Sequence, residues 1–328
     1  MRRNLGYGAP ISKHSCEPDT GSVAVTSAEA SAPCTVGNFG PGFDVLSLAL
    51  EKVGDRVRLT SAPRDEVRVA GAPGSERIPT DWHRNAACAA IDALRERTSR
   101  RGALLVEIHK GVPPGSGLGS SASSCAAAVR AFARYHDITL AAKDALDAAA
   151  KGEAVASGGE HRDDVAAALW GGLTIVGGEG RDLVIRLRPP PLSLVVARPD
   201  VELATREMRG LIPNALPRAD VVHNLSNVAR IVHACHAQDA EMLCRALDDK
   251  ISRPYRAPRV PHFAEMRQAA LSAGAHAFLL SGSGPTVIAA MPARIDADPV
   301  AAALKKFVPD TFVTKPLMEV TEPGVGLP

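Results

Sequence analysis

Three alternating glycines directly before an alanine-rich run constrain the fold of this chain more than any other feature. They fall at Gly115, Gly117 and Gly119 of the stretch "GVPPGSGLGSSAS", residues 111–123. Glycine is costly in regular structure but useful where the backbone bends sharply or approaches another group closely. Alanine is the best helix former, and serine is favoured where a helix begins. The pattern therefore predicts a strand, a tight loop and then a helix that begins at Ser120 or Ser121.

The predicted start of that helix is suited to a phosphate group. The first turn of a helix carries free N–H groups at the positive end of the helix dipole, and glycines allow the preceding backbone to wrap the same anion. A Walker loop would need Gly-Lys-Ser/Thr after four free positions, and this stretch contains no lysine. A tight turn before a capped helix would explain a shorter glycine motif. We predict a phosphate-binding loop of another type, formed by Pro114, Gly115, Ser116, Gly117, Leu118, Gly119, Ser120 and Ser121.

Length and composition limit the class of protein. A chain of 328 residues exceeds what one compact core usually holds, so two domains are expected. The net charge of +2 argues against a dedicated nucleic-acid binder, and no stretch approaches the roughly 18 apolar residues of a membrane span. The six cysteines are scattered without zinc-ligand spacing. We expect a cytoplasmic protein that binds neither nucleic acid nor membrane, with residues 1–21 forming a disordered extension.

The order of the predicted elements favours an α+β fold. Strand-like stretches alternate with helical stretches in two halves, which we assign to an N-terminal domain at 22–178 and a C-terminal domain at 179–328. The strands at 182–189 and 192–199 are expected to open the second half. A Rossmann sheet is disfavoured because GxGxxG is missing after the first strand.

Four motifs in order resemble those of the GHMP-type small-molecule kinases, a family that includes galactokinase, homoserine kinase and mevalonate kinase. "PPGSGLGSSAS" resembles the central motif of the family, and "LLSGSGPTVIAAM" at 279–291 resembles its C-terminal motif. "APCTVGNFGPGFDVLSLALE" at 32–51 and "GEAVASGGEHRDDVAAALWGGLTIV" at 152–176 resemble the homoserine-kinase branch in particular. The resemblance covers roughly residues 22–320.

This resemblance implies a two-domain α+β GHMP-kinase fold with the active site in the interdomain cleft and a ferredoxin-like C-terminal half. It also implies ATP- and Mg²⁺-dependent phosphorylation of a small hydroxyl compound. Ser121 and Glu153 match the magnesium positions of the family, and hard oxygen ligands suit that ion. Asn85 matches a position that contacts adenine, although by itself it would be a helix cap.

The expected acceptor is an amino acid, whose carboxylate is well matched by the fork of an arginine. Arg209 and Arg256 match carboxylate-binding positions of the family, with Arg256 preferred over the nearby Arg253. Any one arginine, taken alone, would be read as a surface charge. The other positions that match substrate-contacting residues are Asn38, Asp44, His161 and Thr205.

One position departs from the homoserine-kinase pattern. Homoserine kinases usually read His-x-Asp-Asn in the substrate segment, whereas this chain reads His161-Arg162-Asp163-Asp164. Asp164 lies where mevalonate kinases carry a catalytic aspartate. Unlike asparagine, aspartate can accept a proton, so Asp164 is predicted either to act as a general base or to orient the acceptor hydroxyl.

The sequence thus predicts an ATP-dependent homoserine kinase that makes O-phosphohomoserine for threonine biosynthesis. Two alternatives stay open: a related kinase acting on mevalonate, threonine or a specialised hydroxy-amino acid, and a kinase-like sensor that binds ligand without turnover. The intact loop, Ser121 and Glu153 speak against the sensor. The oligomeric state also stays open, with a homodimer as one arrangement.

Overall fold

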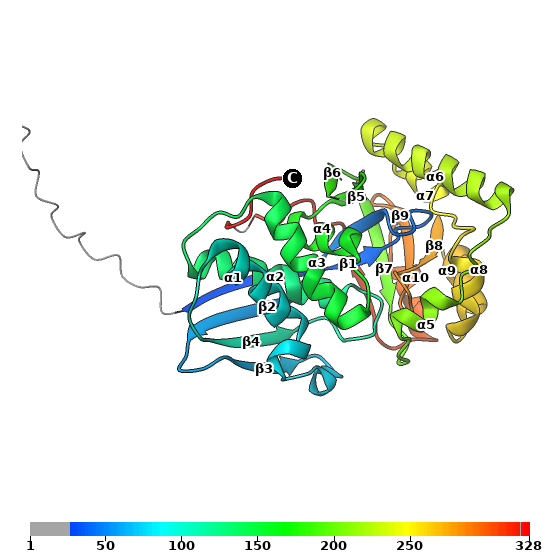
Figure 1. Ribbon diagram of the computed structural model, residues 1–328. Coiled ribbons are helices and arrows are strands. Elements are labelled where there is room, and N and C mark those ends of the chain that lie inside the picture. The colour runs from blue at the N-terminus through cyan, green and yellow to red at the C-terminus, as the bar shows by residue number, and fades with distance from the viewer. Residues whose placement is uncertain (1–26, 181, 322) are drawn as a thin grey trace, which may run out of the picture.

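The computed structural model describes residues 27–180, 182–321 and 323–328, so the predicted extension at 1–21 lies outside the described residues. Two β-sheets organise the described chain, each with helices packed on it (Figure 1). This arrangement confirms the predicted mixed α+β class.

The first sheet is built mainly from the N-terminal half. Its strands run in the order β3-β4-β2-β5-β6, with β1 paired to β2. The β3–β4 pair is parallel and the other pairs are antiparallel. The strands are β1 (Ser27–Gly37), β2 (Leu46–Ser61), β3 (Glu66–Gly71), β4 (Leu104–Lys110), β5 (Leu173–Gly177) and β6 (Leu183–Leu187).

Four helices pack together on this sheet (Figure 1). The helix after the glycine loop, α2, is buried along most of its length because its alanines allow close approach by β1, α1 and α3. The helices are α1 (Ala86–Thr98), α2 (Ser120–Tyr135), α3 (Ala142–Ser157) and α4 (Arg162–Trp170), preceded by the short 3₁₀ turns η1 (Ser75–Arg77) and η2 (Trp82–Arg84).

The second sheet is antiparallel throughout, in the order β10-β7-β9-β8. Its strands are β7 (Leu192–Ala197), β8 (Ala277–Leu280), β9 (Val287–Pro292) and β10 (Thr311–Thr314). The accompanying helices are α5 (Thr205–Gly210), α6 (Arg218–Ala237), α7 (Ala240–Arg245), α8 (Arg253–Arg256), η3 (Ala257–Arg259), α9 (Phe263–Ser272) and α10 (Asp298–Lys305).

Two segments differ from the expected division of the chain. The strand expected to open the second half, β6, pairs with β5 at the edge of the first sheet. The C-terminal segment returns to the first half, where Pro316 forms a bridge with Leu50 and the Gly172 N–H donates to the Leu317 carbonyl over 2.7 Å. Long-range pairing of this kind leaves no local sequence signal. We propose one domain of 27–187 with the tail from 316, and a second between them.

The apolar cores explain how the two sheets are held together. One cluster joins β1, β2 and β5 to one face of the second sheet and to α6 and α7, while α9 and α10 cover the other face of that sheet. All five described cysteines are buried and free, as expected for small core residues, and burial raises the pKa of the Cys34 thiol to about 12. Within the described ranges, no helix is long and apolar enough to cross a membrane.

Candidate active site

The glycine loop leads into α2 as predicted. Gly115, Gly117 and Gly119 all adopt positive φ, of 69°, 78° and 63°, which glycine tolerates without strain. Helix α2 begins at Ser120, and no side chain caps its first turn. The Ser120 hydroxyl instead donates to the Val112 carbonyl over 2.8 Å and fixes the base of the loop. The first N–H groups of α2 are therefore left for a ligand.

The loop is packed too closely for side chains at its glycines. A Cβ on Gly119 would lie 1.9 Å from Thr35 Oγ1, and one on Gly117 would lie 2.6 Å from the Gly284 carbonyl oxygen. The C-terminal motif also binds the loop directly, because the Ser281 hydroxyl donates to the Gly117 carbonyl over 2.7 Å. This contact packs the C-terminal motif against the loop.

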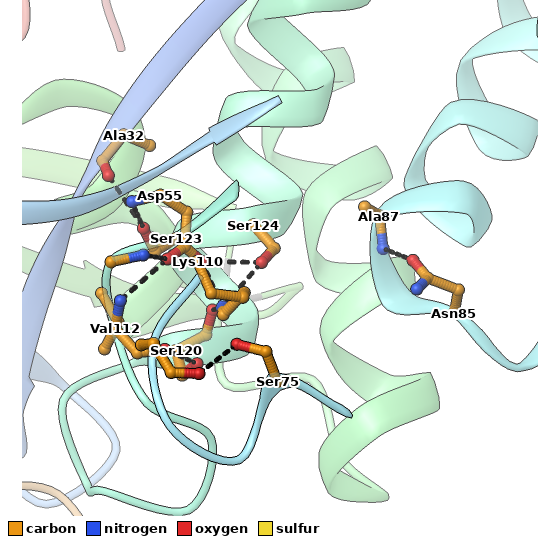
Figure 2. Close-up of polar contacts among 12 residues, drawn as sticks. Ala32, Asp55, Ser75, Asn85, Ala87, Lys110, Val112, Ser120, Ser123 and Ser124 are labelled. Atoms are coloured by element: carbon orange, nitrogen blue, oxygen red, sulfur yellow. Dashed lines mark hydrogen bonds and ion pairs between the residues drawn. The ribbon is translucent and has the colours of Figure 1, made fainter. Parts of the chain in front are cut away.

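A buried ion pair lies beneath the loop, and sequence reasoning missed it. Lys110, the last residue of β4, pairs with Asp55 on β2 and donates to the Ser120 carbonyl and the Ser124 hydroxyl, both over 2.8 Å (Figure 2). Asp55 also accepts the N–H groups of Gly111 and Val112, each over 3.0 Å. The loop itself lacks lysine, but a lysine at the end of the preceding strand was a usable signal.

Two cavities meet at this loop. The larger, of about 730 Å³, falls in the range of ligand pockets, whereas the smaller, of about 90 Å³, is too small for a nucleotide. Segments from both halves of the chain contribute to the walls of each cavity. The residues that line both cavities are Gly115, Ser120, Ser121 and Thr205.

The "GNFGPGFD" turn forms one wall of the small cavity. Asn38 and Asp44 both adopt positive φ, and the Asn38 side chain accepts the Asp44 N–H over 2.9 Å while donating to the Gly282 carbonyl over 3.1 Å. The Asp44 carboxylate accepts two bonds from the Arg209 guanidinium, over 2.7 and 2.8 Å. This bidentate bond raises the pKa of Arg209 and holds its fork at the cavity.

Arg256 reaches the same cavity from α8. It is almost fully buried, and it donates to the Met208 and Gly282 carbonyls over 3.1 Å each. Burial and the neighbouring charge of Arg209 lower the pKa of Arg256 to about 10. Both guanidinium groups also lie within 5.5 Å of the Phe43 ring centre, 5.4 Å for Arg209 and 5.3 Å for Arg256. Arg253 instead pairs with Asp248 and does not line this cavity.

Glu153 and Ser121, the predicted magnesium ligands, both line the small cavity. His161 Nδ1 lies 3.2 Å from Glu153 Oε1. Burial lowers the pKa of the imidazole, but this contact together with the charges of Glu153, Asp164 and Asp163 raises it overall. Glu153 Oε2 is buried without a hydrogen-bond partner, as a ligand to a hard cation would be. The described residues contain no group of three acidic, histidine or cysteine side chains placed to hold a metal. A magnesium ion here would fit if nucleotide phosphates supplied further ligands.

Two adjacent aspartates on α4 complete the small cavity. Asp164 Oδ1 accepts the hydroxyls of Thr35, over 2.6 Å, and Ser47, over 2.9 Å, while its Oδ2 has no hydrogen-bond partner among the described residues. Burial raises the pKa of Asp164 against these two hydrogen bonds. No role for the neighbouring Asp163 was predicted from the sequence. Burial, with the charges of Asp164 and Asp44, raises the pKa of Asp163 to about 7. Its Oδ1 is buried without a hydrogen-bond partner.

The structure brings nearly all the expected site residues to one place. The expected acceptor residues all line the small cavity, and Thr205 Oγ1 lies 3.3 Å from the Ser283 hydroxyl. Asn85 lines the large cavity, but its side-chain oxygen caps α1 by accepting the N–H groups of Ala87 and Cys88, and its amide donates to Pro79. The adenine contact of Asn85 therefore stays a prediction.

This fold and site define a small-molecule kinase. The model for the GHMP kinases N terminal domain matches residues 85–172, and that for the GHMP kinases C terminal region matches 231–310. The chain therefore belongs to the GHMP kinase family, as the motifs predicted.

Several relatives of this chain are homoserine kinases. Homoserine kinase from Haloarcula marismortui is 39% identical over 79% of this chain and 85% of that protein, and the one from Methanocella arvoryzae is 34% identical over 86% and 93%. A crystal structure of homoserine kinase from Cytophaga hutchinsonii has a TM-score of 0.83 and 30% identity over 96% of this chain and 99% of that one. L. major mevalonate kinase, at 17% identity and a TM-score of 0.66 over 92% and 97%, shares the fold.

Proposed function

We propose that this protein transfers the γ-phosphoryl group of ATP to the side-chain hydroxyl of L-homoserine, forming O-phosphohomoserine. One observation carries the proposal: two arginines and two acids with spare hydrogen-bonding capacity line a small cavity that opens at a phosphate-binding loop. The homoserine kinases that this chain resembles support the same acceptor. The product is an intermediate for threonine biosynthesis.

The small cavity offers a separate partner to each end of an amino acid. Arg209 and Arg256 together supply a concentrated positive charge for the carboxylate. The ammonium is assigned to Asp163, because a buried carboxylate oxygen without a partner is costly until a cation approaches it. Asp44 fixes the Arg209 fork, and Asn38 fixes the turn that carries Asp44. His161 and Thr205 also line this cavity.

The nucleotide is assigned to the large cavity, with its phosphates at the start of α2. Gly115, Ser120 and Ser121 line this cavity, and the first turn of α2 carries free N–H groups suited to a phosphate. Ser121 and Glu153 would hold Mg²⁺, which neutralises charge on the transferred group when bound. Lys110 keeps the loop in shape through the Ser120 carbonyl.

Asp164 is assigned the acceptor hydroxyl. Thr35 and Ser47 fix its Oδ1, so Oδ2 is left to accept the hydroxyl proton. As the hydroxyl oxygen forms its bond to the γ-phosphorus, the bond from that phosphorus to the β–γ bridging oxygen breaks and ADP leaves. Its raised pKa makes the Asp164 carboxylate a stronger base for the hydroxyl proton.

A second acceptor deserves a direct test because Asp164 replaces the asparagine usual in homoserine kinases. We would measure ADP release with L-homoserine, mevalonate and L-threonine as acceptors. Turnover is expected with homoserine above the other two. If mevalonate is the better acceptor, the protein is a mevalonate kinase instead. If no acceptor gives ADP release, the kinase-like ligand sensor is favoured.

We also propose a cytoplasmic location and a homodimer. Light scattering tests the homodimer.

A further inference from the structure

We propose that Arg77 binds the polyphosphate chain of the nucleotide and that Glu202 holds it in place until the nucleotide arrives. Arg77 ends the short turn η1 beside the first sheet, and Glu202 follows β7 of the second sheet. Their side chains form an ion pair between Arg77 Nη1 and Glu202 Oε2. The inference rests on the nucleotide site of the proposed function.

The ion pair lies against the first residues of the phosphate loop. A Cβ on Gly74 would lie 2.5 Å from Arg77 Nη2 and 3.2 Å from the Pro114 ring, so the bare glycine makes room for the guanidinium beside the loop. A Cβ on Gly115 would lie 2.7 Å from Glu202 Cγ and 3.0 Å from its Oε1. Both members of the pair therefore flank the segment that the phosphates are expected to approach.

The charges around the large cavity favour exchange of one anion for another. Glu202 is the one carboxylate among the described residues that line this cavity. The basic residues there are Arg77, Arg84, Lys110 and Arg206, and Lys110 is already engaged by Asp55. Among the described lining residues, only the Glu202 carboxylate would repel a phosphate chain that enters the large cavity. The phosphate chain also offers Arg77 a hydrogen-bond acceptor with a higher negative charge than that of Glu202.

The ion pair is weak enough to be exchanged. About half of each side chain is exposed, 56% for Arg77 and 51% for Glu202, and exposed ion pairs contribute little to stability. A guanidinium bound to two phosphate oxygens forms a stronger, charge-assisted contact. Because its members come from the two halves of the chain and both line the large cavity, the pair also bridges the two halves at that cavity.

The test is calorimetric binding of ADP and of adenosine to the intact protein, which needs no turnover. Arg77→Ala is expected to weaken ADP binding about tenfold, as for loss of a hydrogen bond to a charged group, and to leave adenosine binding unchanged. Glu202→Gln is expected to tighten ADP binding by a few fold, and this gain should be smaller when Arg77→Ala is also present, because only the repulsion between Glu202 and the phosphates is then relieved. Arg68→Ala is the matched control, because Arg68 is exposed and paired with Glu66 away from the cavity.

Several results would overturn the inference. One such result is that Arg77→Ala weakens the binding of ADP and of adenosine equally. Another is that Arg77→Ala and Glu202→Gln weaken ADP binding equally. Either result would mean that the pair is a structural bridge between the two halves. ADP binding that is as tight in Arg77→Ala as in the wild-type protein overturns this inference alone. Absence of ADP binding to the wild-type protein overturns the proposed nucleotide site together with this inference.

Discussion

Thr35 donates its hydroxyl to Asp164 Oδ1 over 2.6 Å, from a strand of the first sheet to the start of α4. Thr35 Oγ1 also occupies the space that a Cβ on Gly119 would need. One hydroxyl thus connects the proposed acceptor aspartate to the end of the phosphate loop. The geometry fixes Asp164 relative to the position at which the γ-phosphate is expected.

The first prediction concerns the proton of the acceptor. Asp164→Asn keeps an oxygen to accept from Thr35 and Ser47 but cannot take a proton. We expect kcat with homoserine to fall about a hundredfold or more, as for loss of a general base, while KM changes little. Steady-state kinetics checks this, with the melting temperature as the control for folding. A kcat near that of the wild type would leave Asp164 the role of orienting the hydroxyl.

The second prediction concerns acceptor binding by Arg209. Arg209→Ala should raise KM for homoserine at least about tenfold and leave KM for ATP nearly unchanged, because a charged hydrogen-bond partner of the carboxylate is lost. Arg253→Ala is the matched control, since Arg253 is paired with Asp248 outside the cavity. If KM for ATP rises instead, the arginine serves the other ligand.

The third prediction concerns the closeness of the loop to the C-terminal motif. Gly117→Val would place atoms against the Ser281 and Gly284 carbonyl oxygens, at a residue with φ of 78°. We expect nucleotide binding to be lost. Gly274→Ala is the control, because Gly274 also has a positive φ, 110°, with no atom within 4 Å of the added Cβ, and it lines neither cavity. Unchanged ATP affinity in Gly117→Val would contradict the assignment of the loop.

The sequence predicted most of this site because its residues belong to local motifs. The loop and the helix start follow from spacing within short segments, and the preference for Arg256 over Arg253 follows from the resemblance to the family motif. The unpredicted parts depend on contacts between distant segments. Lys110 meets Asp55 across neighbouring strands, Arg77 meets Glu202 across the cleft, and β6 joins a sheet by pairing that its own residues do not specify.

Asp163 illustrates the same limit. The sequence gives no sign that this aspartate is unusual, because its pKa depends on its folded environment. Burial, together with the charges of Asp164 and Asp44, raises its pKa from 3.8 to about 7. A carboxyl whose pKa is higher in the folded than in the unfolded protein favours folding while it is protonated. That contribution is complete below about pH 4 and is lost as the pH rises through about 7.

The last prediction follows from the direction of this pKa shift. Asp163→Asn resembles the protonated side chain at every pH, so its melting temperature should exceed that of the wild type by a few degrees at pH 8 and by much less at pH 5. The same variant should raise KM for homoserine because the proposed ammonium ligand has lost its charge. Thermal unfolding at the two pH values, without acceptor and then with saturating homoserine, checks both effects. Homoserine should narrow the difference at pH 8, since its ammonium would stabilise the wild-type carboxylate. A difference that is equal at the two pH values would show that Asp163 is already ionised at pH 5 and is stabilised by contacts within the protein.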